Sequence, residues 1–196
     1  MIWRNGKSFY RIDKGSSKYK GKMERKAAAL DDSVEILVNF ALDRNDILKL
    51  IKGKPENDGI SPVTMEYELQ LLKILTIGWG ISYFFENTPL KNVVLESFWN
   101  RINELSKSIS AALTPSLGNG FDYFSILKQR LDLYVKEIGK VSNLSDPGIM
   151  VGPLFAKLCG DEFHDYLILS GKAAFHLSLG DVKKYLESVV IDVHEV

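Results

Sequence analysis

The sequence predicts an all-α fold, an irregular array of six or seven helices. Apolar residues recur every three or four positions over most of the chain, which is the spacing of helices that bury one face. Residues that begin or end helices, such as serine or threonine before proline, or glycine, stand between these segments. The predicted elements also differ in length, and a short one that contains Pro153 intervenes. This variation favours an irregular array over a four-helix bundle.

Length and composition are those of a globular protein with one core. The chain has 196 residues, of which 45% are hydrophobic and 26% charged, and such a length favours one domain. Cys159 is the only cysteine, which excludes an intramolecular disulfide and an all-cysteine metal site. The first residues contain no uninterrupted apolar run that would serve as the core of a signal peptide. We therefore expect a cytoplasmic protein, and we predict no cofactor.

A central helix is predicted over residues 64–87, and its second half is almost entirely apolar. Gly78 and Gly80 lie in that half. A glycine costs a helix about 1 kcal/mol relative to alanine, so the pair suggests that another backbone crosses closely there. Gln70 and Lys73 interrupt the apolar run, which is too short to span a bilayer. We therefore predict a buried core helix and no transmembrane segment.

The other helices are placed by the same periodicity and by their flanking residues. Ser61-Pro62 and Thr88-Pro89 each supply a cap and a first-turn proline, for the central helix and for the next one. Gly180-Asp181 predicts a stop and a restart near the end of the chain. The further helices are expected over residues 31–52 with a break near Asn45, 90–113, 121–138, from Pro147 or Pro153 to 158, 162–178 and 182–190.

Helical spacing also predicts which side chains face the core. Leu105 and Ala112 fall on the buried stripe of the helix over residues 90–113. Phe163 and Leu177 fall on the buried side of the helix over residues 162–178, whereas Arg130 is expected in solvent. The tail after Val190 fits either a short strand or a frayed end.

Residues 1–26 are predicted to be a basic, aromatic N-terminal arm or linker, and residues 27–196 a single helical domain. The arm holds nine basic and two acidic side chains, a net charge of +7, while the rest of the chain carries −7. Asn5-Gly6 indicates a small β-hairpin from Ile2 to Tyr10, which is marginal unless it packs on something. The candidate interaction residues are the aromatic and basic residues of this stretch: Trp3, Arg4, Lys7, Phe9, Tyr10 and Arg11.

A second candidate site is the run of acidic residues around His164. If a helix begins at Asp161, then Asp161, His164 and Asp165 share a face, and with Glu162 they would suit a divalent cation. The sequence contains no Glu-x-x-His pair and no His-Glu-x-x-His motif, however. Acidic residues in a first helical turn are also favoured by the helix dipole without any metal.

Cys159 and His164 suggest a thiol nucleophile, but three nearby acids do not provide the electropositive setting that a reactive thiol needs.

Three functions remain open. The leading hypothesis is a non-catalytic interaction or regulatory module that presents its arm, or a groove beside the central helix, to a macromolecular partner. The second is a small helical enzyme, metal-dependent or not, with Asp161, Glu162, His164 and Asp165 near its site. The third is attachment to nucleic acid or to an anionic membrane surface through the arm. The composition of the arm also fits a solvated tether whose aromatic side chains cover an apolar patch, or a segment that folds back on its own acidic body. The first is favoured because no catalytic motif survives inspection, while the arm has a composition suited to binding.

Overall fold

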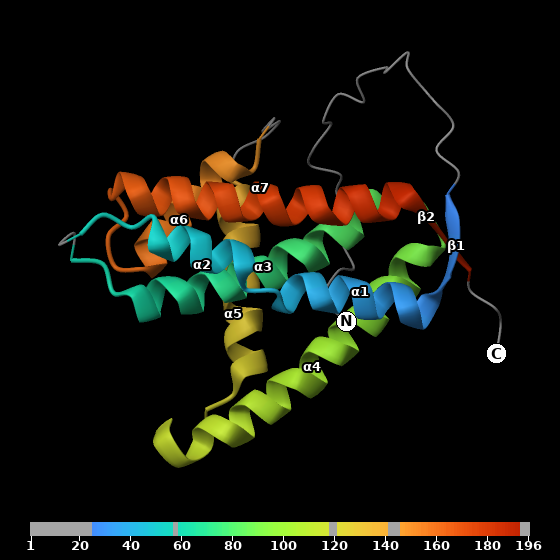
Figure 1. Ribbon diagram of the computed structural model, residues 1–196, viewed down its shortest axis with the longest axis horizontal. Helices are drawn as coiled ribbons and strands as arrows, with labels where there is room; N and C mark the ends of the chain where they lie inside the picture. The colour runs from blue at the N-terminus through green and yellow to red at the C-terminus, as the bar shows by residue number, and fades with distance from the viewer. Residues whose placement is uncertain (1–24, 57–58, 118–120, 141–145, 193–196) are drawn as a thin grey trace.

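The computed structural model describes residues 25–56, 59–117, 121–140 and 146–192. In these residues the predicted all-α array is confirmed, and the predicted hairpin from Ile2 to Tyr10 lies outside them. The helices and strands, shown in Figure 1, are β1 (Lys26–Ala29), α1 (Leu30–Leu42), α2 (Asn45–Lys52), α3 (Pro62–Phe84), α4 (Leu90–Leu117), α5 (Tyr123–Ile138), α6 (Gly148–Leu158), α7 (Asp165–Ser188) and β2 (Val189–Asp192).

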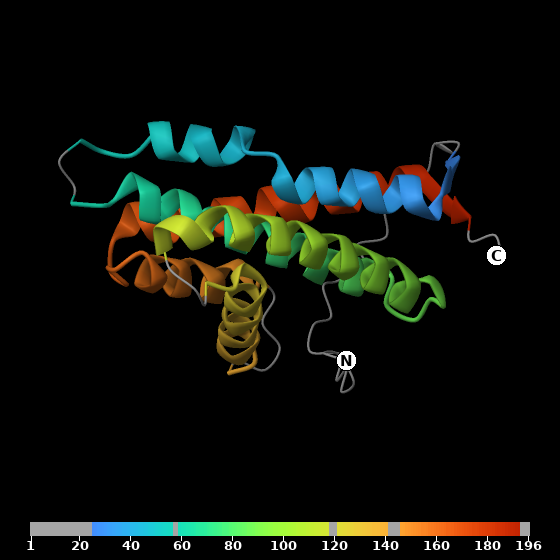
Figure 2. The same cartoon turned by 90° about the horizontal axis from the view of Figure 1, so that it is seen from below.

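Helix α3 is the centre of the fold and contacts every other described helix. It begins as the sequence predicts, because the Ser61 side chain accepts a hydrogen bond from the Thr64 backbone N–H (3.3 Å) and Pro62 occupies the first turn. Every residue from Leu71 to Gly78 is buried. In Figure 2 the α1–α2 pair lies along one side of the molecule and α5 and α6 on the other, with α3 and α7 between them. None of the helices in the described residues has the length and hydropathy needed to cross a membrane.

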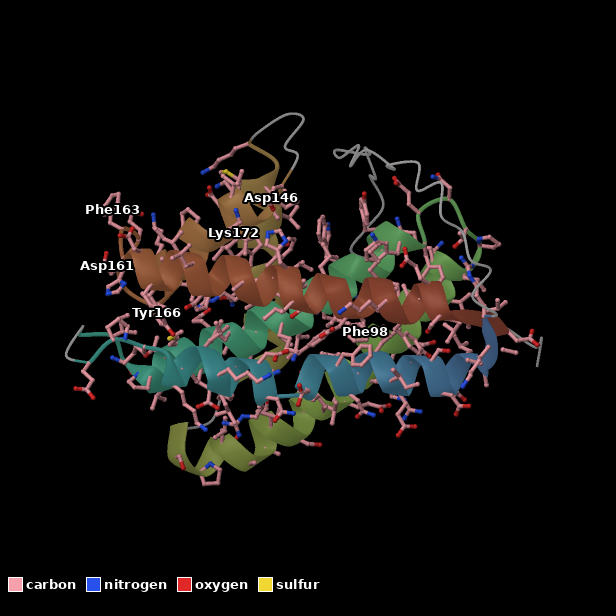
Figure 3. The ribbon with its side chains drawn as sticks, turned by 45° about the horizontal axis from the view of Figure 1, so that its top comes forward. Phe98, Asp146, Asp161, Phe163, Tyr166 and Lys172 are labelled. Atoms are coloured by element: carbon pink, nitrogen blue, oxygen red, sulfur yellow. The ribbon has the colours of Figure 1, made fainter. Side chains whose placement is uncertain are left out.

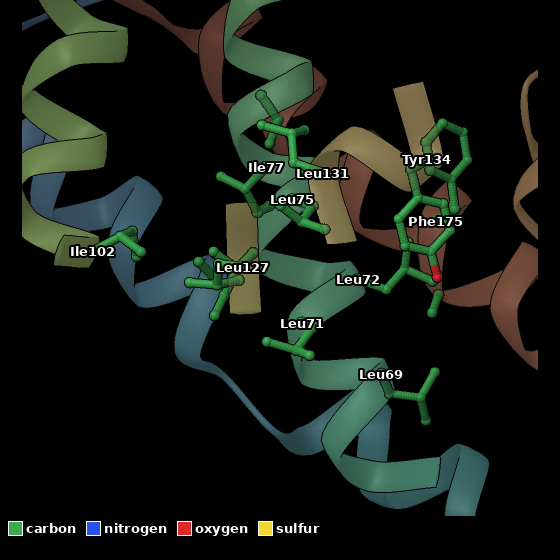
Figure 4. Packing of buried hydrophobic residues seen from close by; sticks show 14 of the residues in the cluster. Leu69, Leu71, Leu72, Leu75, Ile77, Ile102, Leu127, Leu131, Tyr134 and Phe175 are labelled. Atoms are coloured by element: carbon green, nitrogen blue, oxygen red, sulfur yellow. The ribbon is translucent and has the colours of Figure 1, made fainter. Parts of the chain in front are cut away.

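The apolar core forms where the later helices pack on α3. Figure 4 shows the α3 side chains facing Ile102 of α4, Leu127 and Leu131 of α5, and Phe175 of α7, all of which belong to one buried cluster. These neighbours are far apart in sequence. The core is therefore formed by tertiary packing around one helix that is apolar on nearly all sides.

The two glycines of α3 are close to other helices, although not to their backbones. A Cβ atom at Gly78 would lie 2.5 Å from the indole ring of Trp99 in α4, and one at Gly80 would lie 3.2 Å from the Val182 side chain in α7. The prediction that another backbone crosses here is corrected. Side chains fill the space that the glycines leave, and the Trp99 ring is the larger of them.

The break between α1 and α2 falls at Asp43 and Arg44, close to the predicted position. Two polar side chains of α3 bond to the end of α1: the Gln70 side-chain amide donates to the Ala41 carbonyl (2.6 Å), and Lys73 Nζ donates to the Asp43 carbonyl (2.8 Å). Only 4% of Lys73 is exposed. A helix leaves its last carbonyl groups without intrahelical partners, so the residues that interrupt the apolar run of α3 stabilise the end of α1.

Helix α7 runs from Asp165 to Ser188 without interruption. The predicted stop at Gly180-Asp181, with separate helices over residues 162–178 and 182–190, is therefore wrong. The physical reason is burial: Val182 is fully buried against Gly80, and burying a valine side chain contributes about 1.5–3 kcal/mol. That contribution exceeds the roughly 1 kcal/mol that a glycine costs inside a helix.

Two further predictions are corrected or decided in α4 and α6. Leu105 and Ala112 are exposed rather than inward, because the second half of α4 extends away from α3, as Figure 1 shows. Helix α6 begins at Gly148, so the earlier of the two predicted starts is right and Pro153 lies inside the helix.

Strands β1 and β2 form a small parallel sheet in the described residues, with Lys26 opposite Val189 and Ala29 opposite Asp192. The tail was expected to be either a strand or a frayed end, and its first part is a strand. The alanine-rich β1 has no strand signal of its own, and the predicted boundary after residue 26 falls inside it. The sheet joins the beginning of the helical domain to the end of α7.

Candidate functional site

The turn between α6 and α7 is held by its own backbone. Gly160 has a φ of 106°, a conformation that glycine adopts without strain. The Gly160 N–H donates to the Lys157 carbonyl (3.1 Å) and the Asp161 N–H to the Ala156 carbonyl (3.1 Å). These two bonds are the Schellman ending of a helix. Asp161 then accepts a bond from the Phe163 N–H on its side chain (3.1 Å), which gives the turn a defined shape.

This turn determines the position of the predicted enzyme site. Helix α7 begins at Asp165 with His164 as its N-cap residue, so Asp161 precedes the helix. The expectation that Asp161, His164 and Asp165 share one helical face is therefore wrong. Glu162 forms an ion pair with Lys157 (3.4 Å), and His164 Nδ1 is buried without a hydrogen-bond partner in the described residues. In the described part of the chain, no three His, Cys, Asp or Glu side chains are grouped so that they could hold a metal ion.

Phe163 points away from the protein at this turn, as Figure 3 shows, and is 82% exposed. Its predicted inward position is wrong because it precedes α7, so the helical periodicity of α7 does not apply to it. Leu177 is also outward, with 47% exposed. The buried side of α7 is formed by neighbouring positions: Leu167, Ser170, Gly171, Ala174, Phe175, Ser178 and Val182.

The apolar and charged side chains around this turn form what we call the Phe163 surface. Its apolar centre is Phe163. Leu169, which is 64% exposed, lies further along α7, one helical turn after Asp165. Its exposed charged rim consists of Lys157, Asp161, Glu162 and Asp165. Three of the four rim groups are acidic.

The candidate interaction residues of the arm, Trp3, Arg4, Lys7, Phe9, Tyr10 and Arg11, lie outside the described residues. Their role stays a prediction. Arg25 and Lys26, the last two residues of the arm, are exposed, and Lys26 begins β1.

A buried ion pair joins α3 and α5, and sequence reasoning missed it. The Arg130 guanidinium donates three hydrogen bonds to the Glu68 carboxylate, from Nε to Oε2 (2.9 Å) and Oε1 (3.3 Å) and from its NH2 nitrogen to Oε1 (2.6 Å). The Glu68 side chain is 4% exposed and that of Arg130 23%. Glu68 lies on the same face of α3 as Met65 and Leu72, both buried, and a charged residue on an apolar face was the signal that could have indicated a buried partner.

The groups around this ion pair are held in their neutral forms. Burial, and then the charge of Glu68, raise the pKa of the Cys159 thiol to about 12. Burial likewise raises the pKa of Tyr134 well above its usual value, and its hydroxyl has no hydrogen-bond partner in the described residues. A thiol with such a pKa is protonated at neutral pH, and the thiolate is the nucleophile. The raised pKa therefore disfavours Cys159 as a catalytic nucleophile.

Asp146 connects the start of α6 to the middle of α7. Its carboxylate accepts a hydrogen bond from the Gly148 backbone N–H (2.8 Å), and its oxygens lie 3.1 Å from Lys172 Nζ and 3.1 Å from His176 Nε2. Figure 3 shows Asp146 and Lys172 on the same side of the molecule. Burial raises the pKa of Asp146, but the hydrogen bonds from Lys172 and Gly148 and the charge of His176 outweigh it and lower the pKa overall.

This arrangement predicts a pH-dependent effect of Asp146→Asn. A carboxyl group with a lowered pKa in the folded state stabilises the fold above its unfolded pKa of about 3.9, and that contribution is lost as the pH falls through the folded pKa. We expect Asp146→Asn to lower the unfolding free energy by about 1 kcal/mol at pH 7, as for a partly exposed ion pair. Urea titrations from neutral to acid pH should show the two proteins converging below about pH 4.

The matched control is Asp132→Asn, at an exposed position of α5. It should leave the urea midpoint nearly unchanged at neutral pH. A deficit of Asp146→Asn that persists unchanged in acid would show that the side-chain shape, and not its charge, is responsible.

No protein-family model matches this chain, and neither the curated proteins nor the solved structures contain a significant match to it.

Proposed function

We propose that this chain is a non-catalytic helical interaction module that binds a protein partner through the Phe163 surface. The observation that carries the proposal is Phe163 itself, an aromatic side chain left 82% exposed on a turn whose backbone is held by hydrogen bonds. Burying such a side chain contributes about 1.5–3 kcal/mol. A residue on an ordered turn loses little conformational freedom on binding, and aromatic anchors are frequent hot spots of interfaces.

The surroundings of Phe163 indicate what kind of partner would fit. An apolar centre with a charged rim is the usual arrangement of an interface, and the rim here has Asp161, Glu162 and Asp165 against Lys157. We therefore expect a partner with an apolar pocket edged by lysine or arginine side chains. Leu169 would extend the apolar contact along α7. The cytoplasm is the expected location of this interaction.

A photo-reactive phenylalanine analogue at position 163 tests the proposal. Introduced into the full chain in its native cells, it should cross-link to one protein repeatedly after illumination. The purified full chain should then bind that protein, and Phe163→Ala should weaken the binding at least about thirty-fold, as for a hot-spot residue worth roughly 2 kcal/mol. The measurement is a dissociation constant by calorimetry.

Val63 provides the matched control, because it is 78% exposed and lies at the first turn of α3. The analogue at position 63 should not capture the same protein, and Val63→Ala should leave the dissociation constant within about two-fold. Both alanine variants should unfold at the same denaturant concentration as the parent, since exposed substitutions change stability by about 0.5 kcal/mol or less. Equal capture at positions 63 and 163, or unchanged binding by Phe163→Ala, would refute the proposed function.

A further inference from the structure

The register of the small sheet fixes where the N-terminal arm enters the domain. Because β1 and β2 are parallel and Lys26 lies opposite Val189, the start of β1 is beside the residue that directly follows α7. Figure 1 shows β1 beginning next to the C-terminal end of α7. The chain that precedes Lys26 therefore enters the sheet from the side on which α7 ends.

The arm is long enough to extend back along α7 to the Phe163 surface. Helix α7 has 24 residues, which corresponds to about 36 Å. Residues 12–25 alone reach up to about 46 Å when extended. The segment that precedes them, Trp3–Arg11, holds the aromatic and basic side chains at the outer end of the arm.

The chemistry of the arm complements the Phe163 surface. The arm carries a net charge of +7 and the rest of the chain −7, and the rim around Phe163 is mainly acidic. Arginine and lysine side chains stack favourably on an aromatic face, by about 0.5–1 kcal/mol at an exposed site, and aromatic pairs contribute a similar amount. The same features that would suit a basic-edged partner therefore also suit residues 3–11.

We infer that the arm of this chain lies back along α7, so that residues 3–11 cover the Phe163 surface and compete with the protein partner for it. This regulation rests on the proposed function, because arm and partner would use one surface. The competition follows from linkage: the apparent association constant for the partner equals its intrinsic value multiplied by the fraction of chains in which the Phe163 surface is free. Contacts between opposite charges on the exterior weaken with salt, so the arm should be displaced at high ionic strength.

Zero-length cross-linking of lysines to carboxylates in the full chain tests this inference. An equal mixture of ¹⁴N and ¹⁵N protein is treated with a carbodiimide at low and at high salt, and the products are identified by mass spectrometry. We expect links from Lys7 to Asp161 or Asp165, only within one isotope, and at least about three-fold weaker in high salt. The Lys140–Glu137 pair at the end of α5, with Nζ and Oε1 2.6 Å apart, is the internal standard, and the well-exposed Glu104 of α4 is the control carboxylate.

Two results would overturn the inference. Links between ¹⁴N and ¹⁵N chains would place the arm on a second copy, and links at Glu104 as frequent as those at Asp161 and Asp165 would show no docking.

A full-chain variant with Lys7→Glu and Arg11→Glu should lose the specific links and bind the captured partner about ten-fold more tightly. If the links fail while Phe163 still captures a partner, only this inference falls. If the arm docks but no partner depends on Phe163, the proposed function falls instead.

Discussion

Arg130→Met is expected to lower the unfolding free energy by about 3–5 kcal/mol at neutral pH, because it leaves the Glu68 carboxylate buried without its partner. The Glu68 side chain is 4% exposed, and the hydrogen bonds from Arg130 satisfy both of its oxygens in the described structure. Water cannot replace those bonds without opening the packing between α3 and α5. The measurement is equilibrium unfolding in urea, with the midpoint and slope fitted together.

The double variant Glu68→Leu with Arg130→Met is the informative control. Replacing both members of a buried ion pair with apolar residues of similar size is often neutral or stabilising, so this variant should recover most of the loss. Lys140→Met is the control for an exposed pair, since Lys140 pairs with Glu137 three residues away on the surface, and it should change stability by less than about 1 kcal/mol. If Arg130→Met were as mild as Lys140→Met, the ion pair would not contribute to the fold as described.

Gly171→Ala is expected to destabilise the protein by about 3 kcal/mol, at the upper end of what an overpacked core costs. A Cβ atom at this position would lie 2.6 Å from Cβ and 2.7 Å from Cγ of Phe155 in α6. Phe155 is fully buried, and its Cβ and Cγ lie close to the backbone of α6, so they cannot swing aside as the far end of a flexible side chain would. The closeness of α6 and α7 therefore depends on the absence of this one atom.

Gly180→Ala should have the opposite sign on the same helix. No atom lies within 4 Å of the position that its Cβ would take, so the substitution gains the helix propensity of alanine, about 0.5–1 kcal/mol. The midpoint temperature of thermal unfolding should therefore rise for Gly180→Ala and fall for Gly171→Ala. Two changes of the same sign would contradict the packing of α6 on α7.

Local signals in the sequence were sufficient for much of the helical array. Ser61-Pro62 marked the start of α3 correctly because capping requires only the residues of one turn. The break near Asn45 was also indicated locally. The Phe163 surface was not predicted, since Phe163 was assigned to a helix that begins only two residues after it. The acidic residues beside Phe163 instead suggested a site for a divalent cation.

Local sequence patterns therefore establish the class of the fold and the position of most helices, because helix formation and termination depend on neighbours within a few residues. Long-range packing determines which polar groups are buried, that α7 continues through Gly180, and that β1 pairs with β2. Glu68 and Arg130 are 62 positions apart, and the two strands lie at opposite ends of the described chain. Such contacts are determined by the packing of the whole molecule, which no local pattern contains.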